Sequence, residues 1–319
     1  MDQNKKKDYS KLANIILLCL VLAAIAGFLV FWFLAPAFEA TEAAEEAEED
    51  IVAILSGEEA AVSGDTSTDL VVTNLDVGKA DCAILQYQDT TGIIDTGTEK
   101  AYDTIDSFLS DNAIDSFDYM ILTHYDQDHI GSAVKLLQKY PTAAIYIPDY
   151  ESEKRYYPGL MEELASHDNV ITVSGDPVSI QYDDLNIELF PAEDPAPLLA
   201  NESNRDNNMS LVSMVDFGEN KLLFTGDIEA DRISQIVGSG EDLDADWIKI
   251  PHHGSYEEEL DALLEMVTPE DSVISTSSKQ KPDKALLKEL KKLGINSYDT
   301  MDGNVVTICD GTNLVVEGE

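Results

Sequence analysis

Cysteine is nearly absent from this sequence, which has only Cys19, Cys82 and Cys309 among 319 residues. The three lie far apart, without the close pairs of zinc ribbons or the dense spacing of a disulfide framework. We therefore expect neither a cysteine-ligated zinc module nor a disulfide-stapled small domain. The chain is long enough to bury a sizeable core without such staples.

Basic residues are also scarce, with 20 Lys and Arg against 62 Asp and Glu and a formal charge of −42. Four of the basic and two of the acidic residues lie in the first 35 positions, so the remainder carries −44. Such a surface repels polyanions at long range. A nucleic-acid substrate would need metal ions or local groups to overcome that field.

Long apolar runs are absent after residue 34, and residues 12–34 form one with Asn14 as its only strongly polar member. This run of about 23 residues can cross a bilayer and predicts a single transmembrane helix. Lysines precede it and none follows until Lys79. The positive-inside rule thus puts residues 1–11 in the cytoplasm and the rest outside the cell membrane. One span cannot form a channel, so DNA uptake would need a separate membrane partner.

A cleaved signal peptide is the alternative interpretation of the apolar run. Small residues at 35–37 and Ala40 offer a cleavage site, but the apolar core of a signal peptide should span only about 7–15 residues. Residues 35–69 are acidic and small, which predicts a solvated linker. Residues 70–319 are then expected to form one domain.

Strand-like and helix-like runs alternate through this domain. Residues 70–78 and 80–88 predict two strands joined by a tight turn, and 284–293 predict a helix. Residues 191–206 have loop composition. Two β-rich halves with outer helices predict an α/β fold in which two sheets lie between helix layers, an αββα sandwich.

The stretch THYDQDHIG at 123–131 contains four potential metal ligands, His124, Asp126, Asp128 and His129. A buried strand is predicted before it and a helix after it, so the ligands lie on a strand-to-helix loop. Carboxylate and imidazole together suit a divalent ion that activates water. The alternative is a polar turn that caps the next helix.

Six motifs follow one another in an order typical of one family. They are LDVGKAD, GIIDTG, THYDQDHIGS, NNMSLV, LLFTGDIE and KIPHHGS. In this order the chain resembles the metallo-β-lactamase superfamily, and within it the ComEC-like hydrolase domains of competence proteins. The resemblance runs from about residue 70 to the end and implies the αββα sandwich.

The resemblance also implies a ligand set for two metal ions. His124 and Asp126 would hold one ion, Asp128 and His129 would face a second, and Asp227 would bridge them. Either His252 or His253 would complete the second site. Asn207 would stand where relatives place a further histidine, with Asn208 as the alternative. Asp128 and Asp227 would be the catalytic carboxylates.

The chemistry of these residue types agrees with that reading. Two nearby cations can activate a water and hold a phosphoryl oxygen, and a carboxylate such as Asp227 can bridge them where a neutral imidazole cannot. Oxygen ligands at Asp126 and Asn207 shift preference from zinc toward manganese or a mixed site. The expected cofactors are two divalent ions, zinc or manganese.

Further polar residues near the motifs have two readings each. Asp76 and Asp95 lie two residues before a glycine, where they either cap turns or orient metal ligands. Lys79 either contacts a substrate anion or is an ordinary turn lysine. Tyr125 and Ser255 are candidates to hydrogen-bond a substrate oxygen.

One departure from the relatives concerns the substrate. They often carry a His-Pro pair where this chain has Lys281-Pro282, and no histidine follows His253. The leading hypothesis is an outward-facing two-metal phosphodiesterase or nuclease that acts on a phosphate ester, DNA included. The alternatives are a phosphorylcholine-type esterase of the cell envelope, a catalytically silent binding module, and a lactonase or thioesterase.

Overall fold

The computed structural model describes residues 68–257 and 259–318. The predicted transmembrane helix at 12–34 and nearly all of the predicted linker at 35–69 lie outside the described residues. Within those two ranges, no helix has the length and apolar character needed to cross a membrane.

The first sheet has eight strands and mixed strand directions. The middle strands β3, β4 and β5 are parallel, while the pairs from β3 back through β1 to β15 are antiparallel. In spatial order the strands are β15 (Leu314–Gly318), β14 (Val305–Cys309), β1 (Leu70–Asn74), β2 (Ala83–Tyr87), β3 (Thr90–Ile94), β4 (Phe117–Ile121), β5 (Thr142–Pro148) and β6 (Val170–Val173).

The second sheet has seven strands and is also mixed. Its strands β10 to β13 are parallel, and β7 to β10 pair antiparallel. In spatial order they are β13 (Asn296–Asp299), β12 (Asp271–Ile274), β11 (Trp247–Lys249), β10 (Asn220–Phe224), β9 (Val212–Phe217), β8 (Leu185–Phe190) and β7 (Val178–Tyr182).

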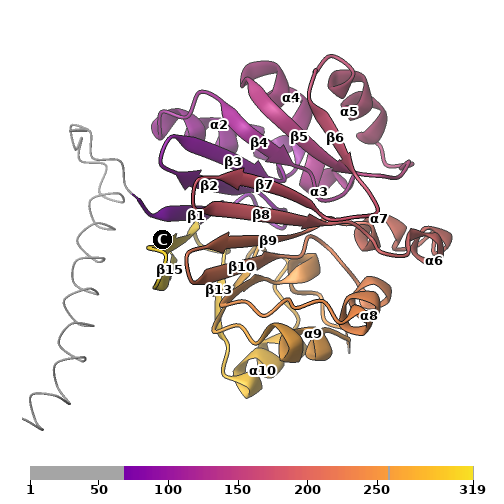
Figure 1. Ribbon diagram of the computed structural model, residues 1–319, viewed down its shortest axis with the longest axis vertical. Coiled ribbons are helices and arrows are strands. Elements are labelled where there is room, and N and C mark those ends of the chain that lie inside the picture. The colour runs from indigo at the N-terminus through magenta and orange to yellow at the C-terminus, as the bar shows by residue number, and fades with distance from the viewer. Residues whose placement is uncertain (1–67, 258, 319) are drawn as a thin grey trace, which may run out of the picture. The chain divides into compact units, whose positions relative to one another are not determined.

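Helices cover the outer face of each sheet, so the domain has four layers (Figure 1). One helix layer contains η1 (Glu99–Ala101), α2 (Tyr102–Asp111), α3 (Gln127–Ile130), α4 (Ala133–Lys139) and α5 (Tyr157–Leu164). The other contains α8 (Ala230–Ser239), η2 (Pro251–Gly254), α9 (Glu259–Val267) and α10 (Lys284–Leu293). Two short helices, α6 (Pro195–Ala200) and α7 (Arg205–Asn208), join β8 to β9.

Three hydrophobic clusters hold the layers together. One lies between the first sheet and its helices, around Ile105 and Leu136. A second fills the space between the sheets, around Tyr119 and Trp247. The third packs the second sheet against α8, α9 and α10, around Leu263. This arrangement confirms the predicted α/β sandwich.

The structure corrects two local expectations. The predicted tight turn near Lys79 is a longer connection, because β1 ends at Asn74 and β2 begins at Ala83. The predicted loop at 191–206 contains α6 and the start of α7. The carboxyl-terminal hairpin joins the first sheet, since β14 pairs with β1.

The parallel strands bring the sequence motifs to one edge of the sandwich. Asp95 directly follows β3, His124 follows β4, and Asp227 follows β10. Side chains after parallel strands gather at the carboxyl edge of a sheet. Gly226 lets the two edges meet, since a Cβ there would lie 2.8 Å from Ser210 Cβ and 3.1 Å from Thr123 Cβ, and its φ is +55°.

Candidate metal centre

His129 is oriented by the carboxylate of Asp95. The His129 Nδ1 lies 2.7 Å from Asp95 Oδ2, and the Thr123 amide and hydroxyl donate to the same carboxylate at 2.8 and 2.7 Å. A carboxylate only accepts hydrogen bonds, so the His129 Nδ1 must carry a proton. Its Nε2 then faces Asp227 Oδ2, at 3.2 Å.

His124 is oriented by two hydroxyls. Its Nδ1 lies 3.1 Å from Thr123 Oγ1 and 3.2 Å from Ser210 Oγ. The Thr123 proton is already donated to Asp95, so Thr123 Oγ1 accepts from His124 Nδ1. The bare Nε2 of His124 points away from these partners.

His253 is oriented by a backbone carbonyl. Its Nδ1 lies 3.1 Å from Ser275 O, which can only accept. Its Nε2 lies 3.3 Å from Asp227 Oδ2 and 3.5 Å from Asp128 Oδ2. The structure thus places His253, of the two candidate histidines, beside Asp227 and Asp128.

Several buried ligand atoms around these three rings lack hydrogen bonds. The Nε2 atoms of His124, His129 and His253 and the Oδ1 of Asp227 are buried and form no hydrogen bond among the described residues, and the same holds for Asp126 Oδ1 and His252 Nδ1. Leaving such atoms unsatisfied is costly, and divalent cations would satisfy them. Ligand atoms of His124, His129 and Asp227 lie within 4.8 Å of one another, as do those of Asp128, His129 and His253. The residues therefore fit a metal centre.

The charges of the cluster show what a cation would replace. Burial lowers the pKa of His253, but the carboxylates of Asp227 and Asp81 outweigh it and raise that pKa to about 9. Burial acts the same way on His129, and Asp227 and Asp95 raise its pKa well above the usual value. Burial, with His129 nearby, lowers the pKa of His124 to about 4. Protons on His129 and His253 neutralise part of the negative charge of the carboxylates, and a bound divalent cation would take over that role.

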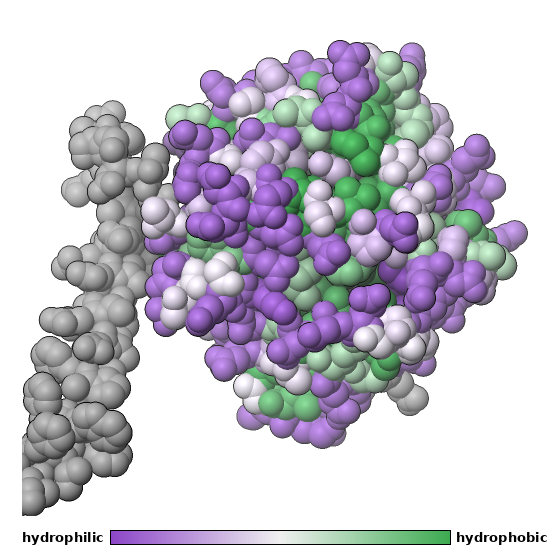
Figure 2. All heavy atoms as spheres, in the orientation of Figure 1, coloured by the Kyte–Doolittle hydropathy of each residue, from purple (hydrophilic) through white to green (hydrophobic). Residues whose placement is uncertain are grey.

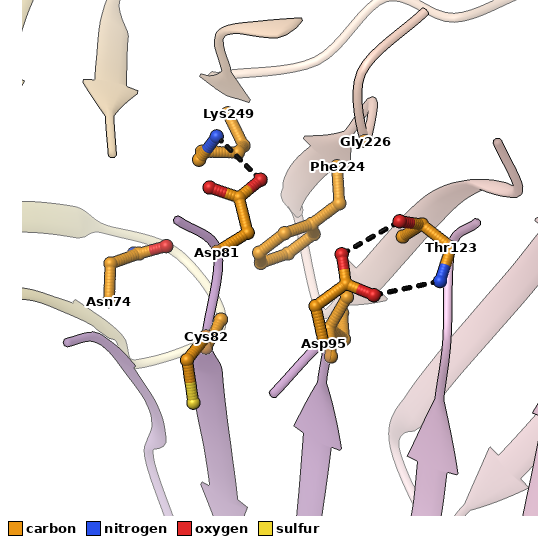
Figure 3. Close-up of a pocket in the computed structure, with 10 residues that line it drawn as sticks. Asn74, Asp81, Cys82, Asp95, Thr123, Phe224, Gly226 and Lys249 are labelled. Atoms are coloured by element: carbon orange, nitrogen blue, oxygen red, sulfur yellow. Dashed lines mark hydrogen bonds and ion pairs between the residues drawn. The ribbon is translucent and has the colours of Figure 1, made fainter. Parts of the chain in front are cut away.

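Asp81 and Lys249 form a buried ion pair behind His253. Lys249 Nζ donates to Asp81 Oδ2 at 2.9 Å and to Ile250 O at 3.1 Å, so this lysine has no access to substrate. Asp81 Oδ1 lies 3.5 Å from His253 Nδ1. Figure 3 shows this pair and the Asp95 bonds to Thr123 on the walls of one small pocket. We call the whole group the inner cluster: Asp81, Asp95, His124, Asp128, His129, Asp227 and His253.

Asp128 is the inner-cluster carboxylate that reaches solvent, with its side chain 29% exposed. Burial raises its pKa, but the contact with His253 Nε2 at 3.5 Å and the charge of His129 outweigh this and hold the pKa far below its usual value. Asp128 is therefore ionised at the mouth of the cluster.

Two predicted ligands lie outside the inner cluster. Asp126 is at the N-cap position of α3, but both of its oxygens lie 2.7 Å from Lys154 Nζ. Asn207 donates to Glu229 Oε1 at 2.5 Å. The alternative Asn208 is buried, and its Oδ1 accepts from the Glu229 amide at 2.9 Å at the start of α8.

His252 faces a different set of carboxylates from its neighbour. Its Nδ1 lies 3.5 Å from Glu229 Oε1, and its side chain is 29% exposed. Glu257 completes this group, and its ligand atom lies within 4.8 Å of the other two. We call Asp126, Lys154, Asn207, Glu229, His252 and Glu257 the outer rim.

The remaining predicted residues divide between structural and open roles. Asp76 accepts from the Gly78 amide at 3.1 Å, which is the turn-capping alternative. Tyr125 was a candidate to hydrogen-bond a substrate oxygen, and in the structure its buried hydroxyl donates to Pro148 O at 2.8 Å. Lys79 lies in the 75–82 connection, and Ser255 directly follows η2; both are partly exposed.

Sequence reasoning assigned no role to Asp81, Lys154, Glu229, Lys249 or Glu257. Asp81 does occur in the quoted LDVGKAD motif, so its place in that motif was an available signal. The other four gave no local signal, because their partners lie between 22 and 168 positions away in the sequence.

Comparison with known proteins agrees with this geometry. The model of the metallo-beta-lactamase superfamily matches residues 75–278. That range contains every residue of the inner cluster.

Two curated relatives are similar to the chain. ComE operon protein 3 of Bacillus subtilis is 26% identical over 254 residues, which cover 72% of this chain and 31% of that protein. Recombination protein 2 of Haemophilus influenzae is 28% identical over 226 residues, 64% of this chain and 24% of that protein. The chain thus spans less than a third of the length of either relative. Among solved structures, the metallo-β-lactamase-fold protein YhfI of Bacillus subtilis aligns at a TM-score of 0.49 and 12% identity, over 78% of this chain and 100% of that one.

Proposed function

Because the chain belongs to the metallo-β-lactamase superfamily, a family of metal-dependent hydrolases, we propose that it hydrolyses phosphate diesters. Its similarity to the ComEC-like relatives supports a phosphodiesterase or nuclease over other hydrolases of the superfamily. DNA is one candidate substrate.

The observation that carries the proposal is a set of four buried ligand atoms that form no hydrogen bond among the described residues and belong to overlapping groups of close ligand atoms. They come from His124, His129, His253 and Asp227. A divalent cation held there supplies Lewis-acid activation of water and of the ester. Asp227, with one oxygen toward two histidines and the other free, is the natural shared ligand.

Asp128 is the carboxylate of the inner cluster that an attacking water can reach. It is ionised, partly exposed and in contact with His253. Because a carboxylate whose pKa lies well below its usual value is a weak base, its role in the proposed reaction is to orient the attacking water, whose proton leaves to solvent, while Asp95 and the Ser275 carbonyl keep the ligand histidines in their tautomers.

The number and identity of the ions are part of the proposal. The residues expected to face the second ion lie together, namely Asp128, His129, Asp227 and His253. Of those expected around the first ion, His124 joins them while Asp126 and Asn207 bind other side chains. We propose a centre of one or two ions, zinc or manganese.

The acidic surface favours a second candidate, an esterase for phosphorylcholine-type substrates of the cell envelope. Hydrophilic residues cover most of the face in Figure 2, and residues after 35 carry a formal charge of −44, since 16 of them are basic and 60 acidic. A zwitterionic choline ester meets less long-range repulsion than DNA. We also propose that residues 12–34 anchor the chain in the cell membrane with the hydrolase domain outside.

The test combines metal analysis with turnover on the purified full-length chain. The substrates are bis-p-nitrophenyl phosphate, p-nitrophenyl phosphorylcholine and single-stranded DNA, each with added manganese or zinc. Bound metal with hydrolysis of bis-p-nitrophenyl phosphate or DNA is the expected result.

The other outcomes are equally informative. Turnover of the choline ester alone would replace the leading proposal with the envelope esterase. A chain that binds neither metal would be a binding module that keeps only the fold. For the anchor, protease added to intact cells should remove the domain, and full protection would contradict the outward orientation.

A further inference from the structure

Six of the 16 basic residues that follow position 35 lie in one short segment, residues 279–292. The segment has two acidic residues, so its formal charge is +4 on a chain that carries −44 beyond position 35. All six lysines are exposed. This segment, which contains most of α10, therefore concentrates positive charge on an otherwise acidic surface.

Three of these lysines lie on one side of α10. Lys284, Lys288 and Lys291 are spaced by four and three residues, which are neighbours on a helix surface at about 5–6 Å. The opposite side is buried, because Leu286 and Leu290 pack into the hydrophobic cluster of the second sheet and its helices. α10 is thus fixed on the outer face of the second sheet (Figure 1), with the three lysines toward solvent. We call these three lysines the basic row.

The ammonium groups of the basic row are open to a ligand. Among residues 68–257 and 259–318, the ion pair that α10 forms joins Lys292 to Glu289, at 2.6 Å. Glu289 raises the pKa of Lys292, with smaller contributions from Asp261 and Glu265 of α9, so Lys292 is left out of the row.

The start of α10 is bonded to the turn that carries His253. Gly254 directly follows His253 in η2, and its carbonyl accepts from the Asp283 amide at 2.9 Å. Pro282 packs so closely on this turn that a Cβ on Gly254 would lie 2.9 Å from the Pro282 Cβ. Lys284 directly follows Asp283, so the basic row begins beside η2 and extends about 10 Å along α10.

From this arrangement we propose that the basic row is the docking surface for a single strand of DNA whose reacting phosphate lies at the inner cluster. The assignment rests on the proposed function, since it takes the substrate to be a phosphodiester. Charges in a line fit a linear polyanion, whereas a small anion would need donors that converge on one point. The row also supplies the local positive charge that a DNA strand needs against a formal charge of −44.

An anionic lipid surface is the other partner that lysines on a helix can meet. A helix that lies in a membrane interface buries its apolar face among the lipids. In α10 that face is already in the protein core, since Leu286 and Leu290 are 0% and 1% exposed. The buried apolar face therefore favours a polyanion in solution over a membrane.

The test compares two triple variants of the full-length, metal-loaded chain, each of which loses three positive charges. The row variant combines Lys284→Gln, Lys288→Gln and Lys291→Gln. The control replaces three exposed lysines of the first helix layer, as Lys100→Gln, Lys135→Gln and Lys139→Gln. Glutamine is a good helix former, so both variants should fold.

Fluorescence anisotropy with a labelled, single-stranded phosphorothioate oligonucleotide measures DNA affinity without relying on turnover. We expect the row variant to bind about 10- to 100-fold more weakly at low salt. The slope of log affinity against log salt should become shallower by about 2, because about 0.7 is lost with each phosphate contact to a single strand. The control should stay within about three-fold, and replacing the same three row lysines by arginine should keep the affinity of the wild type.

Turnover should separate the row from the centre. The row variant should raise KM for single-stranded DNA about ten-fold or more and leave kcat unchanged, since it removes binding that the ground state and the transition state share. Its kcat/KM for bis-p-nitrophenyl phosphate should stay within about two-fold, because this small ester does not reach along α10. Metal content should equal that of the wild type.

Two results would overturn the assignment. One is equal DNA affinity in the row variant and the control. The other is a row variant that keeps its DNA affinity but binds phosphatidylglycerol-containing micelles less well than the wild type does, which would make the row a lipid contact. If the wild type binds DNA through the row but hydrolyses no phosphate ester, the proposed function fails and the docking surface stands.

Discussion

The inner cluster and the outer rim come from the same short motifs, yet their side chains meet different surroundings. His124 and His129 point inward, while Asp126, between them in sequence, points to Lys154. His253 is buried beside Asp227, and its neighbour His252 is partly exposed beside Glu229. Proximity in sequence therefore does not decide which residues form the centre.

The inner cluster and the outer rim differ in the hydrogen-bond partners that orient their side chains. In the inner cluster, the Nδ1 of each histidine is fixed by a carboxylate, a hydroxyl or a carbonyl, and each Nε2 is left buried without a hydrogen bond among the described residues. Such partners fix the tautomer and the ring orientation of a metal ligand. In the rim, Asp126 Oδ2 accepts from Lys154 and the Glu229 oxygens accept from asparagine side chains, while Asp126 Oδ1 and His252 Nδ1 are buried without a hydrogen bond among the described residues. The candidate ligand histidines thus differ from neighbouring polar residues because they are buried and because hydrogen bonds fix the orientation of their rings.

The largest difference in the rate of hydrolysis should appear between the variants Asp227→Asn and Glu229→Gln. Asp227 is two residues from Glu229, but only Asp227 lies within reach of two ligand histidines. We expect Asp227→Asn to lower hydrolysis on the order of a thousand-fold or more, since metal-supplied stabilisation is worth several kcal/mol. Glu229→Gln should stay within about two- to three-fold. Turnover of bis-p-nitrophenyl phosphate measures both.

Metal content and circular dichroism complete that comparison. Asp227→Asn should keep the secondary structure of the wild type and lose bound metal. Full activity in Asp227→Asn, or similar losses in both variants, would contradict the division into an inner cluster and an outer rim.

The next difference, in metal affinity, should appear between variants of His253 and His252. His253→Ala should weaken metal binding about 100-fold or more, because even a residue that only orients a ligand is worth about 10–100-fold. His252→Ala should change the affinity of the centre by less than about three-fold. Titration of the metal-free chain with zinc, followed by calorimetry, gives the two affinities. The opposite order would make His252 the ligand and place the centre on the side of Glu229 and Glu257.

Much of the fold followed from local patterns. The predicted helix at 284–293 coincides with α10, which ends at Gly294 in the left-handed conformation, φ +80°. The strands predicted at 70–78 and 80–88 correspond to β1 and β2, which pair antiparallel. These elements depend on periodicity and on turn residues that neighbours in sequence supply.

The choice between adjacent residues could not follow from such patterns. His252 and His253 both have positive φ, +48° and +53°, so neither strand nor helix periodicity tells which ring faces inward. The partner of Asp126 lies 28 positions later, and that of Asp81 lies 168 positions later. Contacts of this kind depend on how the two sheets meet, which no local pattern encodes.

The smallest contrast concerns Asp76 and Asp95, for which the sequence left the same two roles open. In Asp95→Asn, an amide nitrogen that replaces Oδ2 would face the proton on His129 Nδ1 and favour the wrong tautomer. If the amide turns over, the nitrogen faces the Thr123 amide instead. We therefore expect metal affinity to fall about 10–100-fold. Asp76→Asn keeps the oxygen that accepts from Gly78, so its metal affinity should equal that of the wild type. Equal affinities in both variants would mean that Asp95 only supports the turn after β3, and that Nε2 of His129 is aimed by packing alone.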